Sequence, residues 1–150
     1  MFKRYLYKVA YYIRGIYWLV TQPITQGVKV ILKHQNQILM IRNTYGRRWW
    51  TFPGGGLHRS ESYEAAALRE VKEEVGIEIG QLEHIGEITL QRWYRNHVVV
   101  FETELLGPEF RIAPAEIAEA RWFGSDNLPA YLSPTARKVL DIHPSLNRPT

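Results

Sequence analysis

Residues 52–77 read FPGGGLHRSESYEAAALREVKEEVGI and contain the pattern that decides the fold. Three consecutive glycines, 54–56, stand near the start of this stretch, and Glu70, Glu73 and Glu74 gather near its end. On a helix these three carboxylates share one face within about 100° of arc. Like charges at this spacing repel by about 0.2–0.5 kcal/mol per exposed pair. The last turns of a helix disfavour negative charge as well, so the cluster is unfavourable by itself.

A hard divalent cation would relieve the repulsion within this cluster, because magnesium selects oxygen ligands. The glycines place bare backbone beside the helix, where a carbonyl can join a metal and amides can approach phosphate. Residues 65–67 are alanines, which leave space next to the carboxylates. A lone Glu-x-x-Glu-Glu is more often a solvated charge run, and a lone glycine cluster is more often a turn. Their adjacency favours a site for metal and phosphate.

Length and composition predict one globular domain. The chain has 150 residues, of which 45% are hydrophobic and 13% aromatic, which suits a packed core and excludes a disordered chain. The absence of cysteine excludes a disulfide framework and a thiolate zinc site, and it suits the cytoplasmic location that we expect. The formal net charge of +4 favours anionic partners such as nucleotides, nucleic acid or a lipid surface, without choosing among them.

Hydrophobic periodicity and turn residues predict an α/β domain with a mixed sheet whose faces are covered by helices. We expect strands at 27–33, 38–42, 49–52, 84–91, 97–105 and 118–123, the first two forming a hairpin, and helices at 62–75 and 135–142. In the first helix, Leu68, Val71 and Val75 should face the sheet, and Gly76 should end it with a left-handed cap. Two prolines after His143 predict a loose tail.

The first 22 residues predict a separate amphipathic helix, followed by the main domain over residues 23–150. Apolar residues recur there at helical spacing, and basic residues lie off the apolar stripe. The stretch is too short and too charged to cross a bilayer, and it lacks the cleavage site of a signal peptide. It can pack on its own domain or on the partner in a homodimer. The alternative is peripheral contact of residues 1–20 with anionic lipid.

The glycine–glutamate stretch resembles the signature of the Nudix hydrolases, G-x5-E-x7-R-E-U-x-E-E-x-G-U, in which U is apolar. All seven fixed identities and both apolar positions match without a gap over residues 55–77: Gly55, Glu61, Arg69, Glu70, Val71, Glu73, Glu74, Gly76 and Ile77. Ser60 stands where many members have glycine, and we expect only a local change in the loop. The resemblance implies a Nudix-type mixed sheet sandwiched between helices.

The resemblance also implies hydrolysis of a diphosphate linkage with magnesium, or alternatively manganese, as cofactor. The implied metal ligands are Glu70, Glu73, Glu74 and the carbonyl of Gly55. Glu70 is our first choice for the general base that activates water.

Some family members use a carboxylate from a late loop as the base instead, and Glu116 is the candidate for that place, followed by Glu119. Arg69 is implied to orient the glutamates, with Glu61 as its ion-pair partner and Gly76 as a structural member of the motif.

The substrate is less determined by the sequence. Tyr45 and Trp50 can stack a base, and Arg47 and Arg48 can hold phosphates. Equally, a tryptophan can belong to the core and the arginines to a solvated loop. The substrate classes that remain are nucleoside triphosphates, nucleotide sugars, dinucleoside polyphosphates and the 5′ end of RNA. The alternative function is a non-catalytic nucleotide-binding Nudix-like module, against which the intact glutamates argue.

Overall fold

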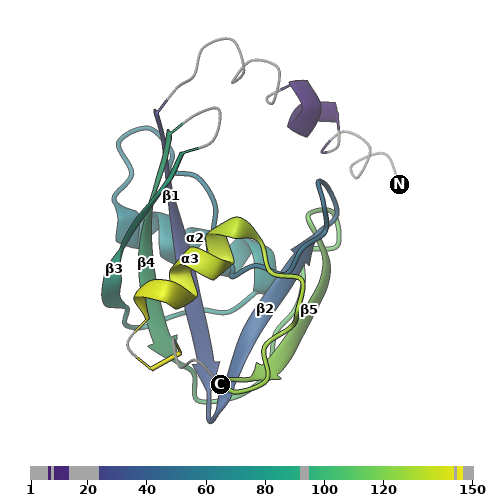
Figure 1. The fold of residues 1–150 in the computed structure, drawn as a ribbon, viewed down its shortest axis with the longest axis vertical. Coiled ribbons are helices and arrows are strands. Elements are labelled where there is room, and N and C mark those ends of the chain that lie inside the picture. Colours follow the sequence, from purple (N-terminus) through teal and green to yellow (C-terminus); the bar gives the residue numbers. More distant parts are fainter. Residues whose placement is uncertain (1–6, 8, 14–23, 92–94, 144, 147–150) are drawn as a thin grey trace.

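A five-stranded mixed sheet forms the centre of the computed structural model, which describes residues 7, 9–13, 24–91, 95–143 and 145–146 (Figure 1). The strands are β1 (Ile24–His34), β2 (Gln37–Asn43), β3 (Glu83–Gln91), β4 (Arg95–Glu104) and β5 (Ile117–Gly124). Their order across the sheet is β3-β4-β1-β2-β5. Strands β1 and β4 run parallel, and the other neighbours are antiparallel, so the predicted mixed sheet is confirmed.

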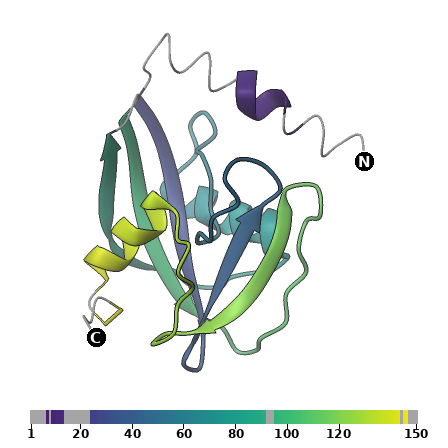
Figure 2. The same ribbon diagram turned by 45° about the vertical axis from the view of Figure 1, so that its right-hand side comes forward.

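Two helices cover opposite faces of this sheet, as Figures 1 and 2 show: α2 (Tyr63–Val75) and α3 (Pro134–Ile142). Successive side chains of a strand point to opposite faces, so alternate residues of β1 belong to different cores. Val28, Val30 and Leu32 pack with α2, and Ile31 packs in the core that contains α3. The predicted arrangement of a sheet sandwiched between helices is therefore confirmed.

Both ends of α2 are capped, and the left-handed glycine cap predicted for its C-terminal end is confirmed. The Ser62 hydroxyl accepts a hydrogen bond from the Ala65 amide at 3.1 Å, as an N-cap does. Gly76 adopts a left-handed conformation with φ 68°, and its amide donates to the Lys72 carbonyl. Helix α3 begins at Pro134, which follows a capping serine.

The predicted buried face of α2 is right at two positions and wrong at one. Val71 and Val75 are fully buried, whereas Leu68 is 39% exposed. The small side chains of Ala66 and Ala67 are buried in its place. Alanine lets the helix lie close to the sheet, and the next residue of the turn then points toward solvent.

Strands β1 and β2 diverge after the turn that joins them, and the chain of residues 50–57 fills the space between them. The ladder between the two strands is confined to the turn end, at Leu32↔Leu39, Lys33↔Ile38 and His34↔Gln37. Further along, the inserted chain completes the hydrogen bonding of both strands. The bonds join the Thr51 and Ile41 backbones in both directions at 2.9 Å, Val30 to Pro53 at 2.9 Å, Val28 to Gly55 at 2.9 Å and Leu57 to Gln26 at 3.2 Å.

The strand predicted at 49–52 is therefore wrong. Trp50 and Thr51 make isolated bridges, to Leu132 and to Ile41 respectively. The inserted chain pairs with β2 at Thr51 and already pairs with β1 at Pro53, whose carbonyl accepts a hydrogen bond from the Val30 amide. A segment that changes partner so quickly cannot form a regular ladder.

Two glycines make this close approach possible. Gly54 has φ +126°, and a side chain there would overlap the Val28 carbonyl oxygen. Gly27 of β1 faces the inserted loop, and a Cβ at that position would lie 2.8 Å from the Gly55 carbonyl oxygen. Both positions are restricted to glycine by backbone contact, because main-chain atoms cannot move aside as a flexible side chain can.

The loose tail predicted from His143 is wrong for its first residue. His143 is buried, and its Nε2 lies 2.7 Å from a Glu102 carboxylate oxygen. Its Nδ1 accepts hydrogen bonds from the Ser145 and Leu146 amides, so Nε2 carries the proton donated to Glu102. Leu146 packs against the core on the α3 face. The side-chain contacts of His143, which periodicity does not reveal, hold this end of α3 to β4.

The predicted N-terminal helix is helical at residues 7 and 9–13. The remainder of that prediction, at residues 1–6, 8 and 14–22, lies outside the described residues, as do most of the positions expected to contact a homodimer partner or lipid. In the described part of the chain, no helix combines the length and the apolar character needed to cross a membrane.

Replacement of Gly54 by alanine should lower the free energy of unfolding by about 1–3 kcal/mol, the cost of a strained backbone conformation. Chemical denaturation in urea measures the change. Gly80→Ala is the matched control, because a Cβ there meets no atom within 4 Å, and its effect should stay within about 0.5 kcal/mol. Equal stability of the two variants would show that the loop does not depend on this contact.

Candidate active site

A cleft of about 1260 Å³ opens beside the glycine loop. It lies among the start of β1, the glycine loop, one face of α2 and the loop before β5. All the acidic residues predicted for the site except Glu119 line it, together with several residues that the sequence did not indicate. The lining includes Tyr7, Tyr11, Lys29, Tyr45, Gly54, Gly55, Gly56, Glu61, Arg69, Glu70, Glu73, Glu74 and Glu116.

The Glu74 carboxylate is buried at the floor of this cleft, with 5% of the residue exposed. It accepts a hydrogen bond from the Gly54 amide at 2.8 Å. Burial raises the pKa of Glu74 to about 7, although Lys29 and the Gly54 amide act in the opposite direction. The negative charges of Glu70 and Glu116 raise that pKa further.

Lys29 supplies a positive charge below the glycine loop, and it is not among the residues predicted from the sequence. Its ammonium group donates hydrogen bonds to the carbonyls of Phe52 at 2.8 Å and Gly54 at 2.5 Å. Desolvation lowers the pKa of Lys29, and the nearby charges of Glu74 and Glu70 oppose this shift. A lysine between valines reads as a solvated strand position, so no local signal marked it as part of the site.

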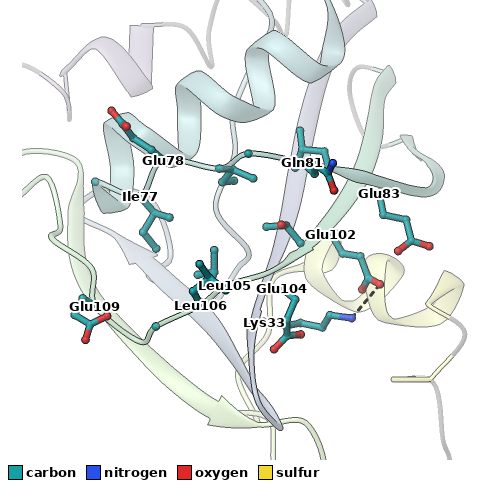
Figure 3. A pocket seen from close by; sticks show the side chains of 16 residues that line it. Lys33, Ile77, Glu78, Gln81, Glu83, Glu102, Glu104, Leu105, Leu106 and Glu109 are labelled. Atoms are coloured by element: carbon teal, nitrogen blue, oxygen red, sulfur yellow. Dashed lines mark ion pairs between the residues drawn. The ribbon is translucent and has the colours of Figure 1, made fainter.

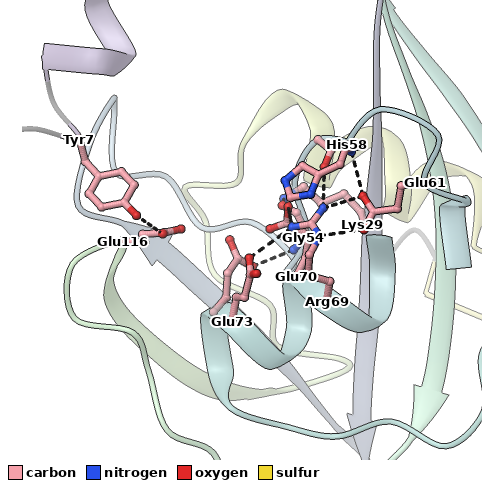
Figure 4. Close-up of polar contacts among 11 residues, drawn as sticks. Tyr7, Lys29, Gly54, His58, Glu61, Arg69, Glu70, Glu73 and Glu116 are labelled. Atoms are coloured by element: carbon pink, nitrogen blue, oxygen red, sulfur yellow. Dashed lines mark hydrogen bonds and ion pairs between the residues drawn. The ribbon is translucent and has the colours of Figure 1, made fainter. Parts of the chain in front are cut away.

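Arg69 connects the rim of the cleft to the acidic cluster (Figure 4). Its guanidinium forms a bidentate pair with Glu61, through Nε at 2.8 Å and Nη2 at 2.9 Å. It also reaches a Glu70 oxygen at 2.8 Å, a Glu73 oxygen at 3.2 Å and the Gly56 carbonyl at 3.0 Å. One planar cation thus holds two turns of α2 and the glycine loop together.

Glu61 is held ionised by this arrangement. The hydrogen bond from Arg69, followed by the His58 amide bond at 2.8 Å, lowers the pKa of Glu61 to about 2. The same contacts raise the pKa of Arg69, so the pair stays charged at every physiological pH. Glu61 is consequently a structural anchor, since both of its oxygens are engaged.

The Glu70 carboxylate lies against the backbone of Gly55, where a Cβ would approach it to 2.6 Å. The Glu73 side chain is 58% exposed and turns toward Arg69. The Gly55 carbonyl accepts the Val28 amide, which leaves its second lone pair for another partner. As these side chains stand, no three acidic or histidine residues of the described chain surround a single point closely enough to hold an ion.

Glu116 reaches the same cleft from the loop before β5, as predicted for a late-loop carboxylate. Its carboxylate accepts a hydrogen bond from the Tyr7 hydroxyl at 2.6 Å, and it contributes to the raised pKa of Glu74. Glu119, the second choice, is paired with Arg42 at 3.3 Å and with Arg121 at 2.8 Å on the sheet. It does not line the cleft.

Of the four residues predicted to bind substrate, one lines the cleft and three do not. Tyr45 lines the cleft. Trp50 is 5% exposed and packs in the core on the α3 face, with the ring of Phe123 edge-on at 4.8 Å. Arg47 and Arg48 are exposed and lie outside the cleft lining, and the Arg47 guanidinium sits over the Trp49 ring.

A second hollow of about 750 Å³ lies between the end of α2 and the ends of β1 and β4 (Figure 3). Acidic side chains dominate its polar lining, and its Lys33 is paired with Glu102 at 3.0 Å. It contains neither the carboxylates of Glu70 and Glu74 nor the glycine loop. The larger cleft is therefore the candidate active site.

The larger cleft has the donor types that suit a hard divalent cation, although three of its acidic side chains do not converge on one point as they stand. Glu70 and Glu74 present carboxylate oxygens beside the glycine backbone, and magnesium prefers such ligands. The raised pKa of Glu74 indicates a carboxylate whose charge is incompletely compensated by Lys29 and one amide. A bound cation would favour the ionised form by the same rule that governs any nearby opposite charge.

The chain is similar to a known protein family and to individual known proteins. A family model described as the NUDIX domain matches residues 23–141. The chain is 34% identical over 110 residues to the NAD-capped RNA hydrolase NudC of Stutzerimonas stutzeri (strain A1501), which covers 71% of this chain and 39% of that protein. It is 36% identical over 93 residues to NudC of Pseudomonas aeruginosa (strain LESB58), with 59% and 32% covered. The chain thus spans about a third to two fifths of these two relatives.

The fold agrees with that of solved structures. The MutT NUDIX hydrolase from Burkholderia pseudomallei superposes with a TM-score of 0.74 at 23% identity, over 79% of this chain and 97% of that one. At this identity the likeness concerns the fold alone.

The stability of the metal-free protein should depend on pH through Glu74. The folded chain keeps a proton on Glu74 that the unfolded chain releases near pH 4.5, so the unfolding free energy should fall as pH rises from 4.5 to about 7. Relative to Glu74→Gln, which cannot titrate, the loss of unfolding free energy should be roughly 3 kcal/mol. Urea denaturation with chelator present gives both curves, and parallel curves would contradict the assignment.

Lys29→Met should lower the unfolding free energy by about 3 kcal/mol, because it leaves the buried Glu74 without its neighbouring positive charge. Lys72→Met is the control, since Lys72 is an exposed lysine paired with Glu78 and should contribute less than about 1 kcal/mol. Thermal or urea unfolding at pH 7.5 compares the two variants. An equally small effect at both lysines would show that Lys29 is not needed to hold the loop.

Proposed function

We propose, from the premise that this chain belongs to the Nudix hydrolase family, that it is a divalent-metal-dependent hydrolase of diphosphate linkages. The observation that supports this most directly is the burial of Glu74 against the glycine loop, next to Glu70. A carboxylate in such a position is costly without a cation. The cleft above it is large enough for a nucleotide and is lined by backbone amides that suit phosphate.

In this proposal Glu70, Glu74 and the free lone pair of the Gly55 carbonyl hold Mg²⁺, or Mn²⁺ in its place, with Glu73 beside them. The bound cation supplies charge neutralisation at the diphosphate and lowers the pKa of the attacking water. Arg69 keeps Glu70 oriented toward the glycine loop, and Lys29 keeps the loop itself in place.

Proton removal from water requires a carboxylate at the cleft, and two are available. Glu70 accepts a hydrogen bond from Arg69 at 2.8 Å. Glu116 accepts one from the Tyr7 hydroxyl at 2.6 Å. Their separate replacement distinguishes the two candidates. Loss of one general base typically lowers kcat by about 10²–10⁴-fold.

The substrate that we propose is a nucleotide with an internal diphosphate. The two NudC relatives are named for action on NAD-capped RNA, which contains such a linkage at its 5′ end. Because the chain spans less than half of these relatives, free NAD⁺, ADP-ribose, nucleoside triphosphates and NAD-capped RNA are separate candidates. The net charge of +4 suits any of these anions.

Glu70→Gln and Glu74→Gln should each lower kcat/KM by at least about 100-fold for whichever compound of this panel is cleaved with Mg²⁺. Glu87→Gln serves as control, because Glu87 is on β3 outside the cleft lining and pairs with His97. Product analysis by chromatography, with circular dichroism to verify folding, provides the measurement. Retention of activity in both cleft variants would refute the assignment.

Metal binding has a readout that is independent of activity. Added Mg²⁺ at pH 7.5 should raise the melting temperature of the wild-type chain and of Glu87→Gln, and should have a smaller effect on Glu74→Gln. Calorimetric uptake of nucleotide that needs no metal and leads to no cleavage would instead favour the non-catalytic nucleotide-binding module.

A further inference from the structure

A short N-terminal segment contacts the candidate active site although it precedes the family domain in the sequence. We call residues 7 and 9–13 the tyrosine segment. Three of its residues, Tyr7, Ala10 and Tyr11, line the cleft that holds the acidic cluster. Figure 4 shows Tyr7 reaching Glu116 on the side of Glu73 opposite to Glu61. The segment therefore forms a wall of the cleft.

Tyr7 anchors this segment by a short hydrogen bond. Its hydroxyl donates to a Glu116 oxygen at 2.6 Å, a distance typical of a charge-assisted O–H···O⁻ bond. This bond is the largest cause of the raised pKa of Tyr7, so the phenol remains protonated and a donor at neutral pH. The bond fixes the tyrosine segment to the loop before β5.

Tyr11 and Tyr45 form an aromatic surface within the same cleft. Their ring centroids are 5.3 Å apart with an interplanar angle of 37°, and the Tyr11 hydroxyl lies beside Gly46. Tyr11 is 37% exposed as a residue, and the Tyr12 ring packs edge-on against it with ring centroids 5.6 Å apart. Because the Tyr11 and Tyr45 rings touch each other, a planar group would stack on the exposed part of the pair instead of between them.

The other lining residues of the cleft indicate which part of a ligand this aromatic pair suits. Near α2 and the glycine loop the lining includes the carboxylates, Lys29, Arg69 and the glycine backbone, which suit metal and phosphate. A nucleobase needs a flat apolar surface, and stacking on an aromatic ring meets that need for any base. Trp50, the other aromatic residue predicted for this role, is enclosed in the core.

We propose that the Tyr11–Tyr45 pair binds the planar base of a nucleoside diphosphate-linked substrate while the diphosphate lies at the glycine loop. Tyr7 is a positioning residue that keeps Tyr11 at the cleft through Glu116. The inference rests on the proposed function, because it assigns the base to one end of the cleft and the phosphates to the other. It predicts that recognition of the base depends on Tyr11, which precedes the NUDIX domain match beginning at residue 23, together with Tyr45 within that match.

Tyr11→Ala tests this with two substrates that both contain a diphosphate: ADP-ribose, which carries adenine, and phosphoribosyl diphosphate, which carries no base. We expect KM for ADP-ribose to rise about tenfold with kcat nearly unchanged, which corresponds to the loss of one stacking contact. KM for the base-free compound should not change. Tyr11→Phe keeps the ring and should behave as wild type, and Tyr7→Phe should give a smaller rise for ADP-ribose alone.

Ile13→Ala is the matched control, since Ile13 is in the same segment, is 62% exposed and does not line the cleft. If Tyr11→Ala is poorly folded by circular dichroism, Tyr45→Ala replaces it, because it removes the other ring of the pair. An unchanged KM for ADP-ribose, or an equal rise for both substrates, would overturn the inference.

Failure of the proposed function leads to a different result, namely that the wild-type chain cleaves neither compound. In that case equilibrium binding of ADP-ribose by calorimetry still decides the role of the pair. A dissociation constant about tenfold weaker in Tyr11→Ala than in wild type would support it. Equal affinity of the two proteins, or no binding by wild type, would reject it.

Discussion

The candidate site depends on the backbone hydrogen bonds that fasten the glycine loop to β1. Because β1 and β2 diverge after their turn, the edge of β1 that faces β2 is left without a strand partner there. Its Val28 and Val30 amides donate hydrogen bonds to the carbonyls of the loop instead. The loop then lies close enough to α2 for the Gly54 amide to bind the Glu74 carboxylate. A side chain at position 54 would separate these parts, so one backbone contact determines whether sheet, loop and helix meet at the cleft.

Two cations make the acidic cluster compatible with a folded chain, and they act from different sides. Arg69 holds the outer edge through a bidentate bond to Glu61 and a bond to Glu70. Lys29 acts from below, where it binds loop carbonyls and its charge opposes the raised pKa of Glu74. Neither arrangement neutralises Glu74 fully. The electrostatics therefore keep the cluster intact and still leave it favourable for a divalent cation, which a fully paired cluster would not be.

The cleft also collects residues from distant parts of the chain. Tyr7 and Glu116 are 109 positions apart and share a hydrogen bond. Helix α2 supplies the carboxylates of Glu70, Glu73 and Glu74, whereas the tyrosine segment and the loop before β5 supply the opposite wall. This division separates the part of the cleft built from the glycine loop and α2 from the part built by segments outside the motif.

The sequence alone determined the features that depend on neighbours within a few residues. The helix bounds follow from Ser62 and Gly76, and the shared face of the glutamates follows from helical spacing. Only the tertiary structure decided which distant groups meet there: it put Trp50 into the core, Lys29 beneath the loop and Tyr11 at the cleft. The physical reason is that capping and periodicity are local rules, whereas strand divergence and loop insertion arise from long-range backbone pairing that no short stretch of sequence encodes.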